Sequence, residues 1–413
     1  MRVPGRATAA AVAVLLSPAA IPVAAVASPA VRTGPCAPVP SISRPPRPAP
    51  PRADPAQRVV GGPALATAGL VVPADVPTPP PVPATSWLVA DLDTGAVLGG
   101  CGPHEYATPA SVQKLLLAAA VLPKLDPTRV VTVTAEDVDI EPGSSAVGLA
   151  EGGRYPIATI WLGLLLQSGN DAANTLARLG GGPDGQAGGV RAMNEEARRL
   201  GALQTHAVTP SGLDGPGQFT SAYDLALIAR ACFANPMFRR YDATLTAMVP
   251  AQPAQRKKGY QIQNDNQLLY RYPGALGGKT GFTDLARHTY VGAAERGGRR
   301  LVVTLLGAEI VDERRGWQQG AALLDWGFRL PRDASVGRLV RPGELDAAPA
   351  SAAGTAPALA AAAGPGLRDA RHRSARPAPL LAAGLAAAVA VAVAALLVRR
   401  RRAAGPSRPR RTR

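Results

Sequence analysis

The chain has 413 residues, with few aromatic side chains, three cysteines and almost no lysine. Aromatic residues make up 4% of the sequence, and basic stripes interleaved with aromatics, the usual mark of nucleic-acid binding, are missing. Half of the net charge of +16 comes from eight arginines in a tail, residues 399–413, that contains no acidic residue. We therefore expect no nucleic-acid partner.

Lysine is rare although the chain is basic, because only five of its 45 basic residues are lysine: Lys114, Lys124, Lys257, Lys258 and Lys279. Arginine cannot give up its proton in a protein, whereas the pKa of a lysine can be lowered until it serves as a base. Each lysine therefore invites a chemical role. The four histidines, His104, His206, His288 and His372, show no metal-ligand spacing, so we expect no metal and no cofactor.

The N-terminal region has the features of an export signal. Residues 1–27 combine Arg2 and Arg6, an apolar run and a small-x-small cleavage site ending at Ala27, which predicts a signal peptide. A retained signal anchor is the alternative, and two prolines in the run disfavour it. Residues 28–85 are rich in Pro, Ala and Val, which predicts a semi-stiff spacer.

The C-terminal region predicts a membrane anchor. Residues 332–379 form a linker rich in Ala, Pro and Gly, and residues 380–398 are an uninterrupted apolar run of 19. Four arginines follow directly and begin the basic tail at 399–413. By the positive-inside rule, we expect a single-pass protein of the cell membrane with a cytoplasmic C-terminus and an extracytoplasmic domain.

Three cysteines in an exported chain allow at most one disulfide. A bond between Cys36 and Cys101 would join the spacer to the folded domain, and the sequence leaves this pairing open. Cys232 lies in an apolar helical stretch, which favours a buried free thiol.

The predicted folded domain spans residues 86–331. Its beginning, SWLVADLDTGAVLGG, has alternating apolar residues around a turn, which predicts a β-hairpin. Helical patterns dominate residues 111–238. Strands are predicted again at 276–281, 289–294 and 300–307, before a last helix at 314–328. Strands at both ends with helices between them predict an α+β fold, in which both ends of the domain build one antiparallel sheet.

Three short motifs carry the candidate chemistry. Ser111 and Lys114 open an apolar helix one turn apart, and Ser-x-x-Lys in that position is a nucleophile signature of penicillin-recognising serine enzymes. By itself the motif is also compatible with a helix-capping serine and a solvated lysine. Two more motifs follow in an order that fits one cleft: Ser168-Gly169-Asn170 at a helix end, and Lys279-Thr280-Gly281 after two glycines on a strand.

With these motifs the chain resembles the D-alanyl-D-alanine carboxypeptidases, the low-molecular-weight penicillin-binding proteins of the serine-type DD-peptidase family. The resemblance covers about residues 87–330, including PGSSAVGLAEGGRYPIATIWLGLLLQSGNDAANTLA, TPSGLDGPGQFTSAYDLALIAR and GALGGKTGFTDLARHTYVGAAERGGRRLVVTLLG. It implies the β-lactamase/DD-peptidase-like fold, an antiparallel sheet with a helical subdomain. The family's C-terminal β-domain and amphipathic anchor have no counterpart in the sequence, and the predicted transmembrane helix stands in their place.

The resemblance also implies roles for individual residues. Ser111 would attack the penultimate D-Ala of a peptidoglycan stem peptide ending in D-Ala-D-Ala and form an acyl-enzyme, with Lys114 as base and Ser168 as proton relay. The oxyanion hole would be made by the backbone N–H groups of Ser111 and Phe282. β-Lactams would bind as inhibitors. Five residues are assigned to substrate binding: Asn170, Lys279, Thr280, Gly281 and Phe282.

Other activities of the same fold are the main alternatives. A β-lactamase of this type needs a deacylating Glu with an Asn four positions later, and Glu195 and Glu196 instead have Arg199 and Leu200 there. Endopeptidase or transpeptidase activity fits the same motifs. A non-enzymatic penicillin-binding sensor would lack a motif residue, and none is lacking. The sequence leaves the stem-peptide preference, the oligomeric state and the role of the basic tail open.

Overall fold

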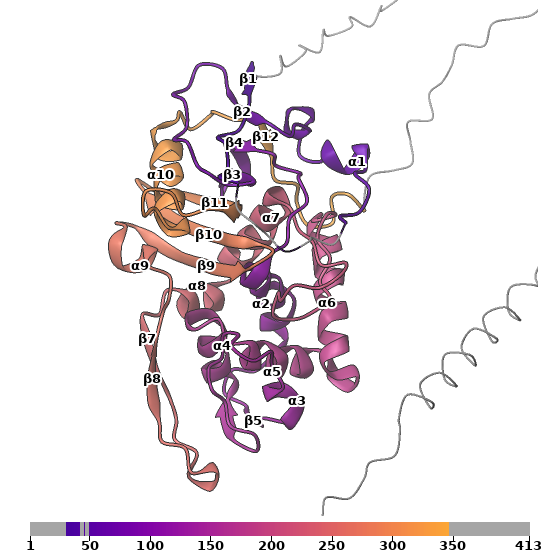
Figure 1. Cartoon of the computed structure of the whole chain (residues 1–413), viewed down its shortest axis with the longest axis vertical. Helices are drawn as coiled ribbons and strands as arrows, with labels where there is room; N and C mark the ends of the chain where they lie inside the picture. The colour runs from indigo at the N-terminus through magenta and orange to yellow at the C-terminus, as the bar shows by residue number, and fades with distance from the viewer. Residues whose placement is uncertain (1–29, 42–44, 46–48, 347–413) are drawn as a thin grey trace, which may run out of the picture. The chain divides into compact units, whose positions relative to one another are not determined.

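Figure 1 shows the computed structural model, which describes residues 30–41, 45 and 49–346. The predicted signal peptide (1–27), transmembrane helix (380–398) and basic tail (399–413) lie outside the described residues. Among the residues that are described, no helix combines the length and the apolar character needed to cross a bilayer.

One antiparallel sheet forms the centre of the domain. Its strands follow the order β1-β2-β4-β3-β11-β10-β9, and a short β12 adds to β4. The strands are β1 (Val31–Gly34), β2 (Leu70–Pro73), β3 (Ser86–Asp91), β4 (Ala96–Cys101), β9 (Ala275–Thr283), β10 (Arg287–Arg296), β11 (Arg299–Ala308) and β12 (Gly337–Arg338). The N-terminal hairpin joins the later strands where Trp87 on β3 pairs with Leu305 on β11. The predicted antiparallel sheet from both ends of the domain is confirmed.

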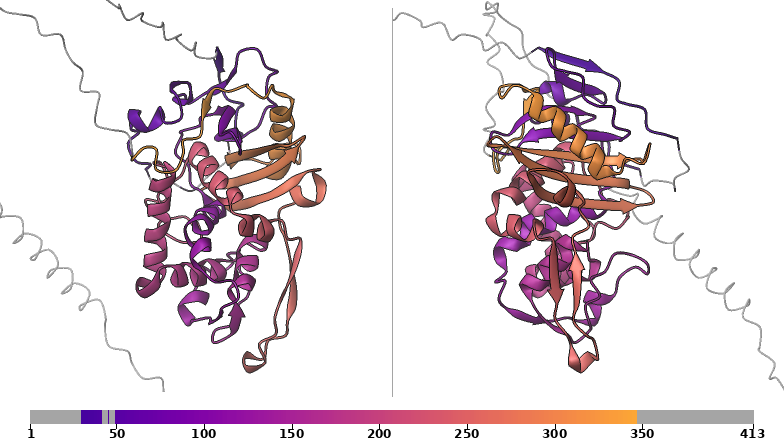
Figure 2. Two further views of the ribbon diagram at one scale, coloured as in Figure 1. Left: turned by 180° about the vertical axis from the view of Figure 1, so that it is seen from behind. Right: turned by 90° about the vertical axis from the view of Figure 1, so that its left-hand side faces the viewer.

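Helices cover both faces of this sheet. On one face α10 (Gly316–Arg329) packs its Leu323 and Trp326 against the sheet, and Figure 2 shows it lying across the strands. On the other face α7 (Ala222–Ala234) lies against β11, where the Thr304 hydroxyl donates to the carbonyl of Ala222 at 2.9 Å. All six residues of β3 are buried, as a central strand covered on both faces requires.

Most of the remaining helices form a subdomain next to the sheet (Figure 1). They are α2 (Lys114–Val121), α3 (Ala135–Val138), α4 (Ile157–Leu166), α5 (Asn170–Gly180), α6 (Gly185–Leu200) and α8 (Pro236–Asp242). Outside this subdomain, α1 (Pro55–Arg58) lies beside the N-terminal strands, and α9 (Leu268–Arg271) lies against β9 and α10. Two small hairpins complete the domain: β5 (Val130–Thr132) with β6 (Arg154–Pro156), and β7 (Thr246–Val249) with β8 (Tyr260–Gln263). The sequence patterns did not predict either hairpin.

The predicted spacer at 28–85 differs from the structure, because β1 near its beginning and most of its second half belong to the domain. β2 pairs with β4 through Leu70 and Val71, and Leu65, Val71 and Val72 are fully buried. The indole of Trp326 donates to the carbonyl of Pro77 at 2.7 Å. The many prolines hid a short Leu-Val-Val strand, which tolerates proline at its end because it lies near the sheet edge.

The predicted linker at 332–379 also begins too early. Gly337 and Arg338 pair with β4, and Val336, Leu339 and Val340 are buried against the domain. The described part of the domain therefore continues at least to Val340, and residues 347–379 lie outside the described part of the chain. Alanine-rich composition masked the few apolar residues that anchor this segment.

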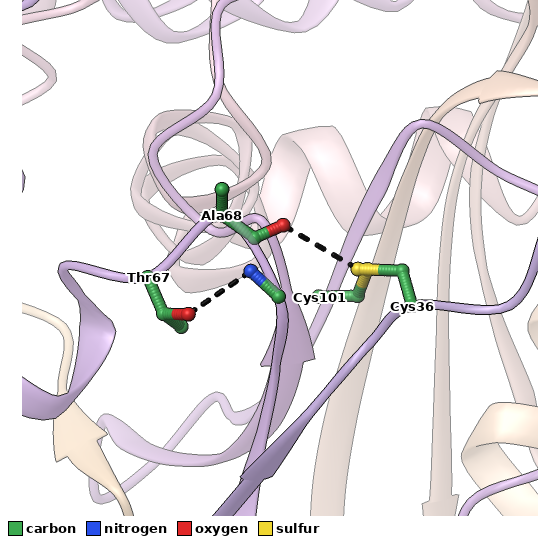
Figure 3. The surroundings of a disulfide bond; sticks show 5 residues. Cys36, Thr67, Ala68 and Cys101 are labelled. Atoms are coloured by element: carbon green, nitrogen blue, oxygen red, sulfur yellow. Dashed lines mark hydrogen bonds between the residues drawn. A yellow bond between two sulfur atoms is a disulfide. The ribbon is translucent and has the colours of Figure 1, made fainter.

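A disulfide between Cys36 and Cys101 joins the N-terminal segment to β4 (Figure 3). The Cα atoms are 5.8 Å apart, within the usual range, and the bond lies beside the carbonyl of Ala68. This confirms the pairing that the sequence had left open. Cys232 is a buried free thiol, as predicted.

Removing this disulfide should destabilise the domain. The bond closes a loop between residues 65 positions apart, and the entropy of such a loop corresponds to about 4 kcal/mol of stability. We expect the double variant Cys36→Ser/Cys101→Ser to lose about that much free energy of unfolding in urea titrations. Reductant should lower the unfolding midpoint of the wild type and leave the double variant unmoved. Equal midpoints for the two proteins would contradict this.

Candidate active site

Residues 110–121, here named the nucleophile helix after the role predicted for Ser111, begin at the centre of the site. Residues Ala110–Gln113 form a 3-10 turn that leads directly into α2, so Ser111 and Lys114 lie one turn apart as predicted. The Lys114 ammonium donates to Ser111 Oγ at 2.8 Å, to Asn170 Oδ1 at 2.8 Å and to the carbonyl of Ser211 at 2.9 Å. The first two motifs therefore meet at the amine of Lys114.

The backbone before Ser111 is strained and tightly packed. Ala110 has a φ of 49°, in the left-handed region that alanine rarely adopts. Gly212 lies directly against it, because a Cβ on Gly212 would lie 2.0 Å from the Ala110 carbonyl oxygen. Strain of this kind persists where the surrounding structure fixes it, and it concentrates at functional sites.

Lys114 is placed so that it can be neutral. Its side chain is fully buried, and burial, followed by the charge of Lys279, holds the pKa of Lys114 well below its ordinary value. The charge of Asp171 acts in the opposite direction. A lysine with a lowered pKa at 2.8 Å from a serine hydroxyl has the geometry of a general base.

Ser168 and Asn170 stand at the start of α5. Ser168 has a φ of 58°, and its buried hydroxyl has no hydrogen-bond partner among the described residues. The next residue, Asp171, lies outside the predicted motifs. Its carboxylate accepts from the backbone N–H groups of Val147, Gly148 and Leu149 at 2.8–2.9 Å and so fixes the loop on that side. In the sequence, the one indication of this role is that Asp171 is an acidic residue in the first turn of a helix.

Lys279 lies beneath the cleft rather than on its surface. It is 2% exposed in the middle of β9, and its ammonium donates to the carbonyl of Thr280 at 2.8 Å. Burial lowers the pKa of Lys279 to about 8, and the carboxylates of Asp265 and Asp242 limit the fall. Asp242, which belongs to none of the predicted motifs, is buried below β9 and accepts from the N–H of Gly278 at 2.6 Å. Burial raises its pKa.

A cleft of about 770 Å³ opens above these residues. Of the predicted site residues, six line it: Ser111, Ser168, Asn170, Thr280, Gly281 and Phe282. Gly281 is needed at its position, because a Cβ there would lie 2.9 Å from the backbone nitrogen of Ser111. β9 and the nucleophile turn can therefore approach closely enough to share one bound group.

The mouth of the cleft has features that the sequence did not predict. Phe282 is 49% exposed, its ring lies 4.8 Å from that of His288, and the Arg287 guanidinium lies over it at 5.2 Å. Four carboxylates line the cleft: Glu141, Asp214, Asp265 and Asp284. They come from separate loops, so no local sequence pattern could bring them together. Among the described residues, no group of three or more His, Cys, Asp or Glu side chains could hold a metal ion.

The fold and the Ser111–Lys114 pair together define a serine-type peptidase. Comparison with known families matches residues 74–310 to the D-alanyl-D-alanine carboxypeptidases. D-alanyl-D-alanine carboxypeptidase DacB2 of Mycobacterium tuberculosis is 47% identical over 263 residues, which cover 63% of this chain and 87% of that protein. DacD of Escherichia coli is 35% identical over 262 residues, and the match spans 61% of this chain and 64% of DacD.

Solved structures agree with this match. A crystal structure of a D-alanyl-D-alanine carboxypeptidase from Mycobacterium tuberculosis has a TM-score of 0.61 at 46% identity, covering 65% of this chain and 99% of that one. The Streptomyces K15 DD-transpeptidase has a TM-score of 0.58 at 26% identity, covering 62% of this chain and 100% of that one. The chain belongs to the D-alanyl-D-alanine carboxypeptidase family of serine hydrolases.

Proposed function

We propose that this enzyme removes the terminal D-Ala from peptidoglycan stem pentapeptides through an acyl-enzyme on Ser111. The observation that carries the proposal is the contact of 2.8 Å between the buried amine of Lys114 and the Ser111 hydroxyl at the floor of the cleft. A serine next to a lysine that can lose its proton is an activated nucleophile.

Acylation follows from the positions of these groups. Neutral Lys114 takes the hydroxyl proton while Ser111 Oγ attacks the carbonyl carbon of the penultimate D-Ala. The oxyanion that forms accepts hydrogen bonds from the backbone N–H groups of Ser111 and Phe282. Each such donor contributes a factor on the order of 10²–10³ to the rate. The carbon–nitrogen bond then breaks, and the proton reaches the leaving amine through the unpartnered hydroxyl of Ser168. Water hydrolyses the ester and restores Ser111.

The terminal carboxylate of the substrate binds on the β9 side. The Thr280 hydroxyl supplies a donor at the cleft wall, and the Lys279 ammonium supplies positive charge from beneath it. Asn170 accepts from Lys114 through its side-chain oxygen and so orients the base. β-Lactams, which carry a carboxylate next to a reactive amide, would bind in the same place as inhibitors.

The pKa of Lys279 predicts a pH dependence. Lys279 loses its proton as the pH rises through about 8, well before an ordinary lysine, and the attraction for the substrate carboxylate is lost with it. We expect kcat/KM for a D-Ala-D-Ala peptide to fall above pH 8. A peptide amidated at its C-terminus, hydrolysed slowly, should lack this basic limb. Identical profiles for both peptides would contradict the assignment of Lys279.

The function is tested by incubating the purified protein with a pentapeptide ending in D-Ala-D-Ala and identifying the products. Release of one D-Ala is expected, and an intact peptide would overturn the proposal. Because the K15 relative is named a DD-transpeptidase, transpeptidation is a second candidate. An added amine acceptor and a cross-linked peptide dimer, run in parallel, separate transpeptidase and endopeptidase activities from the carboxypeptidase.

The two glutamates considered for a β-lactamase lie away from the cleft. Glu195 and Glu196 lie on α6, where Glu196 pairs with Arg199, and neither lines the cleft. We expect penicillin to acylate the enzyme and to be released slowly. Rapid turnover of penicillin, measured by loss of its absorbance, would favour a β-lactamase.

We further propose that the protein acts outside the cell membrane. The predicted signal peptide and the apolar run at 380–398 support export and a single anchor, with the C-terminus in the cytoplasm. The disulfide is compatible with an oxidising compartment. Protease treatment of intact cells should remove the domain and leave a tag on the C-terminus intact.

A further inference from the structure

One loop forms a roof over the catalytic lysine. Residues 208–218, here named the roof loop, contribute Gly212, Leu213 and Asp214 to the cleft. The loop also supplies the Ser211 carbonyl that accepts from Lys114 at 2.9 Å. Its Asp214 accepts from the Thr283 hydroxyl on β9 at 2.7 Å. The roof loop therefore bonds with Lys114, lines the cleft and bonds with β9.

A single buried side chain, Gln218, holds this loop together. It is 1% exposed, and its Oε1 accepts from the backbone N–H groups of Val208 and Thr209 at 3.1 and 3.0 Å and from the Thr209 hydroxyl at 3.2 Å. Its side-chain nitrogen donates to the carbonyl of Leu213. Gln218 thus joins the beginning of the roof loop to its middle, on either side of Ser211.

The same side chain ties the roof loop to the nucleophile helix. Gln113, between Ser111 and Lys114 in the sequence, donates to Gln218 Oε1 at 3.0 Å and to the carbonyl of Thr209 at 2.5 Å. The roof loop also presses on the nucleophile turn, because Gly212 packs against the Ala110 carbonyl. A displacement of the loop would therefore move the Ser211 carbonyl relative to Lys114.

We propose that Gln218 is a positioning residue for acylation. It holds the roof loop against the nucleophile helix, so that the Ser211 carbonyl keeps its hydrogen bond with Lys114 and water is excluded from the Lys114 amine. This rests on the proposed function only in that Lys114 serves as the base. Buried polar networks of this kind are costly to break, because every partner is left without a hydrogen bond. Misplacing a catalytic group by about 1 Å costs on the order of 10²-fold in rate.

The test is the variant Gln218→Met, which preserves the length of the side chain and removes all five hydrogen bonds. We expect kcat to fall by about 10- to 100-fold, with KM within a factor of about two because Thr280 and Lys279 are untouched. A loosened loop admits water to Lys114, and burial is the largest cause of its low pKa. The acid limb of the kcat/KM profile should therefore move to higher pH.

A matched control is Gln204→Met. Gln204 is also buried, at 4% exposed, and its side-chain oxygen and nitrogen bond with the ring and the carbonyl of His104 at 2.7 Å rather than with the roof loop. It should show the same order of loss in thermal stability and an unmoved acid limb. If Gln218→Met behaves like Gln204→Met, with kcat and the acid limb both unchanged, the proposal is wrong.

Two further measurements keep the test decisive. Should Gln218→Met fail to fold, Gln113→Met removes the two bonds from the helix side and should shift the acid limb in the same direction; an unshifted limb overturns the proposal. Fluorescent penicillin measures acylation without a peptide. If the wild type releases no D-Ala, the proposed function fails, and the penicillin acylation rates of Gln218→Met and Gln204→Met still decide the role of Gln218.

Discussion

Ser111→Ala should abolish both D-Ala release and covalent labelling by fluorescent penicillin. The hydroxyl of Ser111 lies 2.8 Å from the Lys114 amine and lines the cleft, where a substrate carbonyl can reach it. Loss of a nucleophile from a coupled catalytic group costs on the order of 10⁴-fold or more in kcat. The Lys114 amine keeps its contacts with Asn170 and Ser211, so the fold should be preserved.

The measurement is a gel assay for bound penicillin together with peptide hydrolysis. Ser335→Ala, remote from the cleft, is the matched control and should label like the wild type. Labelling that persists in Ser111→Ala at the wild-type rate would mean that another residue is the nucleophile.

Lys114→Arg should be nearly as harmful, although it preserves the charge. The chain uses arginine almost everywhere, yet the pKa of an arginine stays too high for it to accept the Ser111 proton. The lowered pKa of Lys114, caused first by burial, has no counterpart in the variant. We expect acylation to slow by on the order of 10³-fold, in the usual range for a lost general base.

Lys124→Arg is the control for this exchange. Lys124 is exposed and outside the cleft, so its replacement should leave activity and penicillin labelling unchanged. Peptide hydrolysis and stopped-flow acylation at several pH values are the measurements. Wild-type acylation by Lys114→Arg at neutral pH would show that proton transfer does not pass through residue 114.

The parts of the fold that local patterns determine were predictable from the sequence. The hairpin of β3 and β4, the helix of α4 and the late strands all follow from alternation or helical spacing, and the structure confirms them. Ser221 caps α7 by accepting from the N–H of Asp224 at 3.1 Å.

The parts of the fold and the site that were not predicted depend on a few residues, some of them within segments of biased composition. β2 is a four-residue strand within a proline-rich segment, and its stability comes from burial of Val71 and Val72 rather than from its own pattern. Asp171 and Asp242 bind backbone N–H groups 22 to 36 positions away, and Gln218 bonds with Gln113, 105 positions away. Such contacts leave no periodic trace in a sequence, which is why the motif residues were found and their supports were not.

The pairing of β3 with β11 also determines when the enzyme can become active. Trp87 meets Leu305 at the centre of the sheet, so more than two hundred residues separate the two partners along the chain. A chain that emerges N-terminus first presents Ser111 long before the strand that carries Lys279 and its neighbour β10. Non-local pairing of this kind is slow to form. The active site can therefore be complete only after β11 has been synthesised and has closed the sheet.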